Sequence, residues 1–329
     1  MFDKDTLNDE NVKVNELTGI KLLVHLIGND DLILDVCMDL STKRDITRNE
    51  IFLLPGIEGC GNIFDSLIQQ IKAPATCLQY GAYHIGTGYT SINEIADQLL
   101  KHILSKKKLK RDFTIVGYSM GSLIAIELAR KLEGMNLQGR LVLIDGAPEQ
   151  MKALVNHHLP FNTIFELENN ILLGIMDTIQ PALSGKLLLE LNKCTNWDKK
   201  LDVFIAHVPS TYKKLSVDNN KFLCTTIYER LIAIHKYDVT QLPKIESPII
   251  LLKPMIKSLS FLQEDYGLHK ITKGNVEVFY IEGNHVTMMD NDKVVAIINE
   301  EHIESVKKLK LNLTDHDNIT SDKDIYTRS

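Results

Sequence analysis

Residues 113–121 read FTIVGYSMG, and this stretch indicates the fold of the whole chain. A run suited to a buried strand leads into Gly-Tyr-Ser-Met-Gly, and a helical pattern, SLIAIELARKLEG, follows at 122–134. A serine at such a sharp strand-to-helix turn has a strained backbone, so its side chain projects above the carboxyl edge of the sheet. A Cβ two residues before or after Ser119 would crowd neighbouring backbone, which explains Gly117 and Gly121. The pattern predicts a nucleophile elbow, G-x-S-x-G.

The pentapeptide alone is a weak signal, because three fixed positions in five arise by chance. The alternative is a serine that only packs a turn. The flanking strand and helix favour the nucleophile, since a sharp turn between these two elements is the structural context that the motif requires.

Short apolar strands alternate with helical patterns on both sides of this turn. We expect strands at 51–54, 76–80, 113–117, 140–145, 246–254 and 275–283, with helices at about 62–72, 91–106, 119–134 and 293–309. This alternation predicts βαβ units. The expected fold class is therefore α/β, a mostly parallel sheet flanked by helices.

The alternation is interrupted once, which predicts how the chain is divided. Residues 149–245 have helical patterns and no clear strand, so we expect a helical lid inserted into the core. The core then has two parts, 49–148 and 246–310. Residues 1–48 are expected to be an N-terminal linker and edge segment, and the polar tail at 311–329 to be disordered.

Composition narrows the function classes. The chain has 329 residues and a formal charge of −6, which argues against a general nucleic-acid binder. No apolar run approaches the length of a membrane span, and the polar, acidic start MFDKDTLNDENVK does not resemble a signal peptide. Five cysteines without a CxxC pair suggest reduced thiols in a cytoplasmic protein. We expect no metal and no cofactor.

A serine hydroxyl is a poor nucleophile without a base, and the elbow predicts an acid and a histidine further along the chain. The strand RLVLID ends in Asp145, after the serine helix, and VEVFYIEGNH ends in His285, before the C-terminal helix. His285 is expected to take the Ser119 proton and return it to the leaving group. Asp145 is expected to hold the imidazole tautomer and stabilise the imidazolium.

Other residues compete for these two roles. In many folds of this type the acid follows the next strand, where Glu264 and Asp265 are the nearest candidates. The acid directly at the strand end is preferred. Among the other histidines, His84 follows a strand but precedes the serine, and His157 and His158 could line a pocket.

Two backbone N–H groups are needed to stabilise a tetrahedral oxyanion. One comes from the residue after the nucleophile, Met120, and the other from the loop LLPGIEGCG at 53–61. Its glycines allow an amide to turn inward, and Ile57 is the expected donor.

Two further motifs have plainer explanations. Asp65-Ser66-Leu67 matches the tripeptide that carries phosphopantetheine in carrier proteins, but it lies inside a βαβ unit with no room for a carrier bundle. The basic cluster at 106–111 is interpreted as a solvated turn, with docking of an acidic partner as the alternative.

Five segments together resemble the thioesterase domain of animal type I fatty acid synthase, in a form similar to the insect enzymes. They are LLPGIEGC (53–60), CLQYG (77–81), VGYSMGSLIAIELARKL (116–132), LVLIDGAP (141–148) and IEGNH (281–285). The resemblance spans roughly 48–310 and is weakest through the insertion. It implies an α/β-hydrolase core with a helical lid and supports Ser119, Asp145 and His285 as the triad. Such relatives often have Asp where this chain has Asn284.

The resemblance also implies a substrate and a partner. The reaction is hydrolysis of a long-chain fatty acyl thioester from the phosphopantetheine of an acyl carrier protein, which ends chain growth and releases the acid. Such a domain is normally the last part of a very long polypeptide, so the chain is expected to be either a part or a paralogue of a larger synthase.

The helical segment itself fits an acyl substrate. Residues 167–192 are rich in Leu and Ile, and a minority of them could line a groove while the rest pack together. A carboxylesterase or lipase of the same fold is the first alternative function. A catalytically inactive hydrolase fold used for binding is the second, and it predicts a missing triad member, whereas all three are present.

Overall fold

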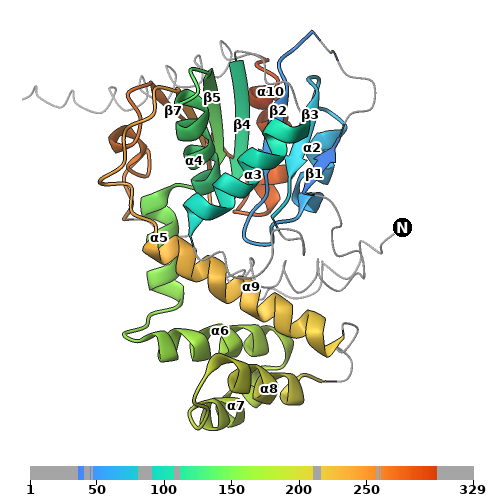
Figure 1. Cartoon of the computed structure of the whole chain (residues 1–329), viewed down its shortest axis with the longest axis vertical. Helices are drawn as coiled ribbons and strands as arrows, with labels where there is room; N and C mark the ends of the chain where they lie inside the picture. Colours follow the sequence, from blue (N-terminus) through green and yellow to red (C-terminus); the bar gives the residue numbers. More distant parts are fainter. Residues whose placement is uncertain are drawn as a thin grey trace, which may run out of the picture.

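The computed structural model describes residues 36–40, 45, 47–80, 91–106, 112–209, 216–256, 259 and 261–301. Within this part of the chain, one sheet has the order β1-β3-β2-β4-β5-β6-β7 (Figure 1). Its strands are β1 (Cys37–Asp39), β2 (Ile51–Leu54), β3 (Ala75–Leu78), β4 (Asp112–Tyr118), β5 (Gln138–Ile144), β6 (Ile249–Pro254) and β7 (Val276–Ile281). Only β1 is antiparallel to its neighbour. The predicted α/β fold with a mostly parallel sheet is confirmed.

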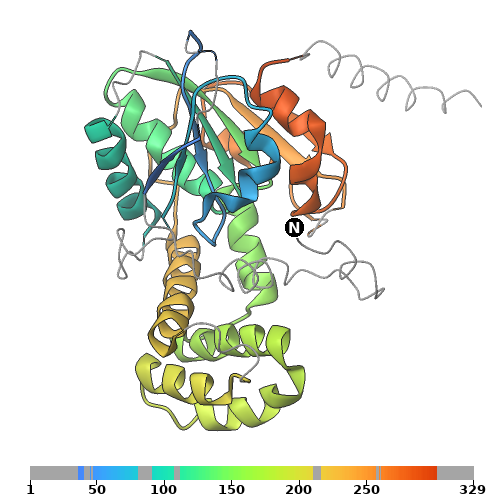
Figure 2. The same ribbon diagram turned by 90° about the vertical axis from the view of Figure 1, so that its right-hand side faces the viewer.

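Helices cover both faces of the sheet (Figures 1 and 2). One face packs against α3 (Ile92–Lys106) and α4 (Gly121–Glu133); the other packs against η2 (Gly61–Phe64), α2 (Asp65–Ile68), η6 (Thr287–Asp290) and α10 (Asp292–Ile298). The side chains of successive strand residues point to opposite faces of the sheet, as in any pleated strand. In β4, Ile115 joins the core under α3 and α4, and Val116 joins the core on the other side.

The chain between β5 and β6 is helical. Its elements are α5 (Pro148–His158), α6 (Ile164–Ile179), η3 (Pro181–Leu183), α7 (Ser184–Leu191), α8 (Trp197–His207) and α9 (Val217–Lys236). Helices α5 and α9 pack side by side and lead away from the sheet, and α6, α7 and α8 lie at the far end (Figures 1 and 2). We call residues 149–245 the helical insertion.

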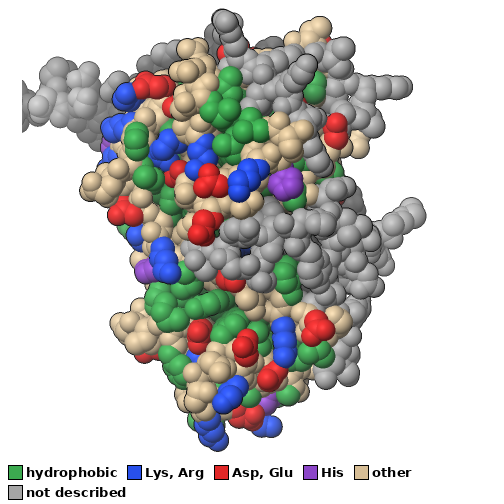
Figure 3. Space-filling model, viewed as in Figure 1, with side chains coloured by type: hydrophobic (Ala, Val, Ile, Leu, Met, Phe, Trp, Pro, Cys, Tyr) green, Lys and Arg blue, Asp and Glu red, His purple; other side chains and the backbone are tan. Residues whose placement is uncertain are grey.

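A buried cation stabilises the far end of the helical insertion. Lys200 has no exposed side-chain surface, and its Nζ lies 2.9 Å from a carboxylate oxygen of Glu168. The same Nζ donates to the carbonyl of Phe165 and lies 3.3 Å from the centre of its ring. A buried ammonium needs such partners, because its loss of hydration is otherwise uncompensated. On the face of the molecule shown in Figure 3, acidic and basic side chains are interspersed.

Two predicted helices are shorter than the patterns suggested. The helix expected at 62–72 is a 3-10 turn followed by α2, which ends at Ile68. The helix expected at 293–309 ends at Ile298, because Glu300 has a φ of 63° and Asn299 is tied to the neighbouring loop. The Asn299 side chain accepts from the N–H of Lys72 and donates to the carbonyl of Gln70.

Several sequence predictions lie outside the described residues. They concern the N-terminal residues 1–35, the tail from 302 onward, His84 in the 81–90 segment, and most of the basic cluster, at 107–111. Within the described residues, no helix is both long enough and apolar enough to cross a membrane.

Candidate active site

The serine turn has the geometry expected of a strained elbow. Ser119 directly follows β4 and has a φ of 53°, a region that L-residues seldom adopt. A Cβ on Gly117 would lie 2.6 Å from the Cα of Ser122, and one on Gly121 would lie 2.3 Å from the carbonyl oxygen of Pro55. Both contacts are with backbone, which cannot move aside easily. The steric reason expected for the two glycines is therefore confirmed.

Asp145 and His285 meet at the same edge of the sheet. His285 Nδ1 lies 2.6 Å from Asp145 Oδ2, and the Asp145 side chain is buried. Asp145 follows β5 directly, and its N–H donates to the carbonyl of Leu252 at 2.8 Å, which fixes it to the neighbouring strand. Because Nδ1 faces the carboxylate, Nε2 is the ring nitrogen that remains for proton exchange.

Tyr118 connects the histidine to the serine turn. Its ring stacks on that of His285 with centroids 4.9 Å apart, and its hydroxyl donates to the His285 carbonyl at 3.1 Å. Among the described residues, however, no hydrogen bond joins Ser119 Oγ to His285. In apo enzymes catalytic hydrogen bonds are often long and tighten when substrate binds. The structure thus brings the acid and the histidine into contact and leaves the serine beside them.

The second oxygen of Asp145 also has donors, which the sequence did not predict. Tyr266 Oη donates to Asp145 Oδ1 at 3.2 Å, and Gln150 Nε2 lies 3.3 Å from the same oxygen. Burial, followed by the charge of Asp145, raises the pKa of Tyr266, so its hydroxyl keeps the proton that it donates. These donors orient the carboxylate toward His285.

The alternative acids are engaged elsewhere. Asp265 Oδ2 lies 2.6 Å from Nδ1 of the exposed His269, four residues later. Glu264 accepts from the hydroxyl of Tyr280 at 2.8 Å. Neither carboxylate contacts His285, so the geometry favours Asp145 over both.

The loop after β2 approaches the elbow and carries an amide that has no acceptor among the residues that the structure describes. The close approach of Gly121 to the Pro55 carbonyl puts this loop against the start of α4. Gly56, Gly59 and Gly61 each donate their N–H within the protein. Among the described residues, the N–H groups of Ile57 and Met120 have no acceptor. An oxyanion hole requires two such amides, so Ile57 and Met120 remain the candidate donors.

Two titratable side chains in this loop are shielded from water, because Glu58 is buried and Cys60 is half-buried. Burial raises the pKa of Glu58, although its own N–H, that of Gly56, and the charges of Arg230 and His285 oppose the shift. Burial, and then the charge of Glu58, raise the pKa of Cys60 to about 12. The Cys60 thiol therefore stays protonated near neutral pH and is a poor nucleophile.

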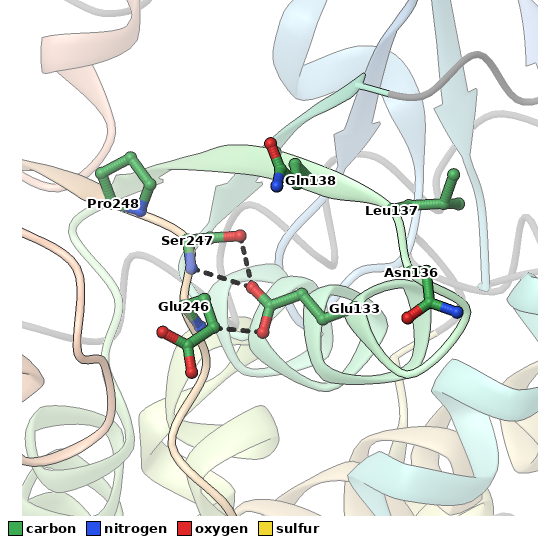
Figure 4. Close-up of a pocket in the computed structure, with 8 residues that line it drawn as sticks. Glu133, Asn136, Leu137, Gln138, Glu246, Ser247 and Pro248 are labelled. Carbon is green, nitrogen blue, oxygen red and sulfur yellow. Dashed lines mark hydrogen bonds between the residues drawn. The ribbon is translucent and has the colours of Figure 1, made fainter.

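A cavity of about 470 Å³ lies at the other end of the strands (Figure 4). The residues that line it lie where β5 and β6 begin, whereas Ser119 and Asp145 lie where β4 and β5 end. Within it, the carboxylate of Glu133 already accepts from the N–H of Glu246 and from the N–H and hydroxyl of Ser247. This cavity is therefore separate from the candidate site.

The remaining sequence candidates have structural roles. The hydroxyl of Ser66 donates to the carbonyl of Met289, which joins α2 to η6. His157 and His158 contact each other edge to face at the end of α5. No cluster of three or more possible metal ligands occurs among the described residues.

Comparison with known proteins gives the same architecture. Residues 49–167 match the family model described as the thioesterase domain. The matched segment contains Ser119 and Asp145 and ends before His285.

Three solved structures illustrate the likeness. A four-domain nonribosomal peptide synthetase, holo-AB3403, has a TM-score of 0.59 and 18% identity over 83% of this chain, which spans only 20% of that protein. The type II thioesterase BorB from the borrelidin biosynthetic cluster has a TM-score of 0.55 and 17% identity, covering 82% of this chain and 98% of its own. RedJ, a thioesterase of the prodiginine pathway in Streptomyces coelicolor, has a TM-score of 0.51 and 15% identity, covering 81% and 96%. At these identities the likeness establishes the fold.

Proposed function

We propose that this chain is a serine hydrolase that cleaves acyl thioesters carried on the phosphopantetheine of a carrier protein. The observation that supports this most is the 2.6 Å pair of His285 and Asp145 beside a serine in a left-handed turn. The thioesterase-domain match over 49–167 supports the thioester as the bond cleaved.

The residues suggest a two-step reaction. Ser119 Oγ attacks the thioester carbonyl while His285 Nε2 takes its proton, and the pantetheine thiol leaves with that proton. Water then attacks the acyl-enzyme with the same histidine as base, and the free acid is released. Asp145 stabilises the imidazolium in both steps. The N–H groups of Ile57 and Met120 stabilise the oxyanions, and no metal or cofactor is needed.

A carrier-bound substrate is supported by the structural neighbours. BorB is described as a type II thioesterase of a biosynthetic cluster, and AB3403 as a four-domain peptide synthetase. We extend this to the present chain as a hypothesis, because its fold is the same. An acyl carrier protein is accordingly the proposed partner, from a fatty acid synthase of which the chain is a part or a paralogue.

A long-chain fatty acyl group is proposed on two further grounds. The sequence resembles the thioesterase domain of animal fatty acid synthase along the segments quoted above. In addition, exposed apolar side chains follow β6 at Met255, Ile256 and Phe261. The N–H of Ile256 donates to the carbonyl of Gly283, so this apolar segment borders the His285 loop. An acyl chain leaving the site would find apolar surface there.

The test compares hydrolysis of palmitoyl-CoA, palmitoyl-phosphopantetheine on a carrier protein, and p-nitrophenyl butyrate. Ser119→Ala should abolish thioester turnover. Ser66→Ala is the matched control, since the Ser66 hydroxyl donates to the Met289 carbonyl and has no hydrogen bond to a proposed triad residue. We expect turnover to favour long-chain thioesters. Rapid ester cleavage with little thioester turnover would favour the esterase instead, and equal rates for wild type and Ser119→Ala would reject the mechanism.

A further inference from the structure

A buried arginine of the helical insertion binds the loop that carries the Ile57 amide. Arg230 lies on α9 and is only 4% exposed. One of its terminal nitrogens donates to the carbonyl of Ile57, and the other donates to the carbonyl of Tyr80 at 2.6 Å. The guanidinium also lies over the Tyr80 ring, 4.9 Å from its centre. Burying this cation requires such partners, so its location is unlike that of an ordinary surface arginine.

Tyr80 fixes the adjoining peptide unit. Its hydroxyl lies 2.5 Å from the carbonyl oxygens of both Pro55 and Gly56. The carbonyl of Gly56 and the N–H of Ile57 belong to one planar trans unit and point in opposite directions. By holding that carbonyl, the Tyr80 hydroxyl sets the direction of the Ile57 N–H.

Arg230 fixes the next peptide unit and the tyrosine itself. The Ile57 carbonyl belongs to the unit that follows the Ile57 Cα, so the two planes that define the backbone of Ile57 are both held. Arg230 holds one of them directly. It also acts on the other, because it binds the carbonyl of Tyr80 and covers the Tyr80 ring. Removing the guanidinium would release both planes together.

We propose that Arg230 is a positioning residue for the oxyanion hole. It holds the 55–59 loop so that the Ile57 N–H points at the substrate carbonyl oxygen, which becomes the oxyanion when Ser119 attacks the adjoining carbon. The geometry of the hole then depends on how α9 packs against the core. This inference rests on the proposed function, because it needs Ser119 to be the nucleophile. A hydrogen-bond donor aimed at developing charge acts only in the transition state, so its misplacement should lower kcat rather than raise KM.

The test uses Arg230→Met, Arg230→Lys and Tyr80→Phe, with kcat and KM for an acyl thioester. A long-chain alkyl trifluoromethyl ketone supplies a second measurement, since Ser119 Oγ adds to its carbonyl and leaves an oxyanion in the hole. We expect Arg230→Met to lower kcat about 10- to 100-fold with KM within about threefold. Affinity for the ketone should fall by the same factor as kcat. Arg230→Lys should be intermediate, because an ammonium keeps the charge but not the two-pronged donor.

Arg130→Met is the matched control. Arg130 is also largely buried and donates to a backbone carbonyl, that of Pro243, at 2.9 Å. It lies near the opposite end of α4 from the serine. This variant should lower the melting temperature while leaving kcat and ketone affinity within about twofold.

The outcomes separate this inference from the proposed function. The inference is overturned if folded Arg230→Met or Arg230→Lys keeps the wild-type kcat and ketone affinity, or if Arg130→Met loses both equally. If Arg230→Met does not fold, the Arg230→Lys and Tyr80→Phe variants decide. If wild type hydrolyses no thioester, the rate of Ser119 labelling by an alkyl fluorophosphonate replaces kcat. Labelling that slows in the Arg230 variants supports the inference even though the substrate assignment has failed. A wild-type Ser119 that does not react overturns both.

Discussion

His285 Nδ1 and Asp145 Oδ2 lie 2.6 Å apart although 140 residues separate them in the chain. Parallel strands make this contact possible, because all of them end at the same edge of the sheet. The helical insertion separates the two residues in sequence without moving either from that edge.

Asp145→Asn should therefore reduce kcat by about 10³- to 10⁴-fold, since the amide favours the wrong imidazole tautomer and cannot stabilise the imidazolium. Asp265→Asn should leave kcat within about threefold, because Asp265 contacts the exposed His269 instead. Steady-state thioester hydrolysis by the two purified variants measures this. A larger loss in Asp265→Asn would move the acid to the later loop.

Tyr266→Phe tests whether the hydrogen bond from Tyr266 to Asp145 matters for the proposed reaction. Without the Tyr266 hydroxyl, Asp145 Oδ1 keeps only the donor from Gln150, so the carboxylate is less firmly oriented toward His285. We expect kcat to fall about two- to tenfold while KM stays within about threefold. Tyr280→Phe removes a hydroxyl that donates to Glu264 and should leave kcat unchanged. A wild-type kcat in Tyr266→Phe would show that the Tyr266 hydroxyl does not position the acid.

Glu58 predicts a dependence of stability on pH. Burial raises its pKa in the folded chain above the ordinary value of 4.5. Between that value and the raised pKa, Glu58 releases a proton on unfolding, so its contribution to wild-type stability falls as pH rises. Glu58→Gln lacks this titration. Its melting temperature relative to wild type should therefore rise as the pH increases from 4 to 7, and a constant difference across this range would contradict the shift.

Gly121→Ala should destabilise the fold, because the added Cβ would lie 2.3 Å from the Pro55 carbonyl oxygen. The expected loss in unfolding free energy is about 1–3 kcal/mol, with activity lost as the elbow shifts. Gly185→Ala is the control, since no atom lies within 4 Å of a Cβ at that helical position. It should stabilise by up to about 1 kcal/mol. Denaturant unfolding curves measure both, and an undisturbed Gly121→Ala would disprove the close packing of loop and helix.

The sheet, and the positions of Asp145 and His285 at its edge, could be predicted because both depend on local sequence. An apolar strand is recognisable from its own residues, and a polar residue that directly follows a strand must lie at the edge of the sheet. Helix ends were predicted less well, because the stop at Ile298 depends on Asn299 bonding to a loop more than 200 residues earlier.

Two residues were not predicted because their contacts are with residues far away in the sequence. Arg230 occurs in the ordinary helical run ERLIAIHK, and its bond to Ile57 spans 173 residues. Tyr266 lies 121 residues from the carboxylate that it contacts. A pattern search along the chain has no means of detecting either contact. A charged residue on the apolar side of α9 was the one available signal for Arg230.

Helix α9 has one consequence for controlling such an enzyme from outside. It is a single helix of 20 residues, about 30 Å long, that contacts the 55–59 loop through Arg230 and packs against α6 and α8 at the far end of the molecule. A displacement at that far end would be transmitted through α9 to the loop that carries the proposed oxyanion-hole amide of Ile57. An antibody fragment that binds α7 and α8 is therefore expected to inhibit the proposed reaction without contacting Ser119.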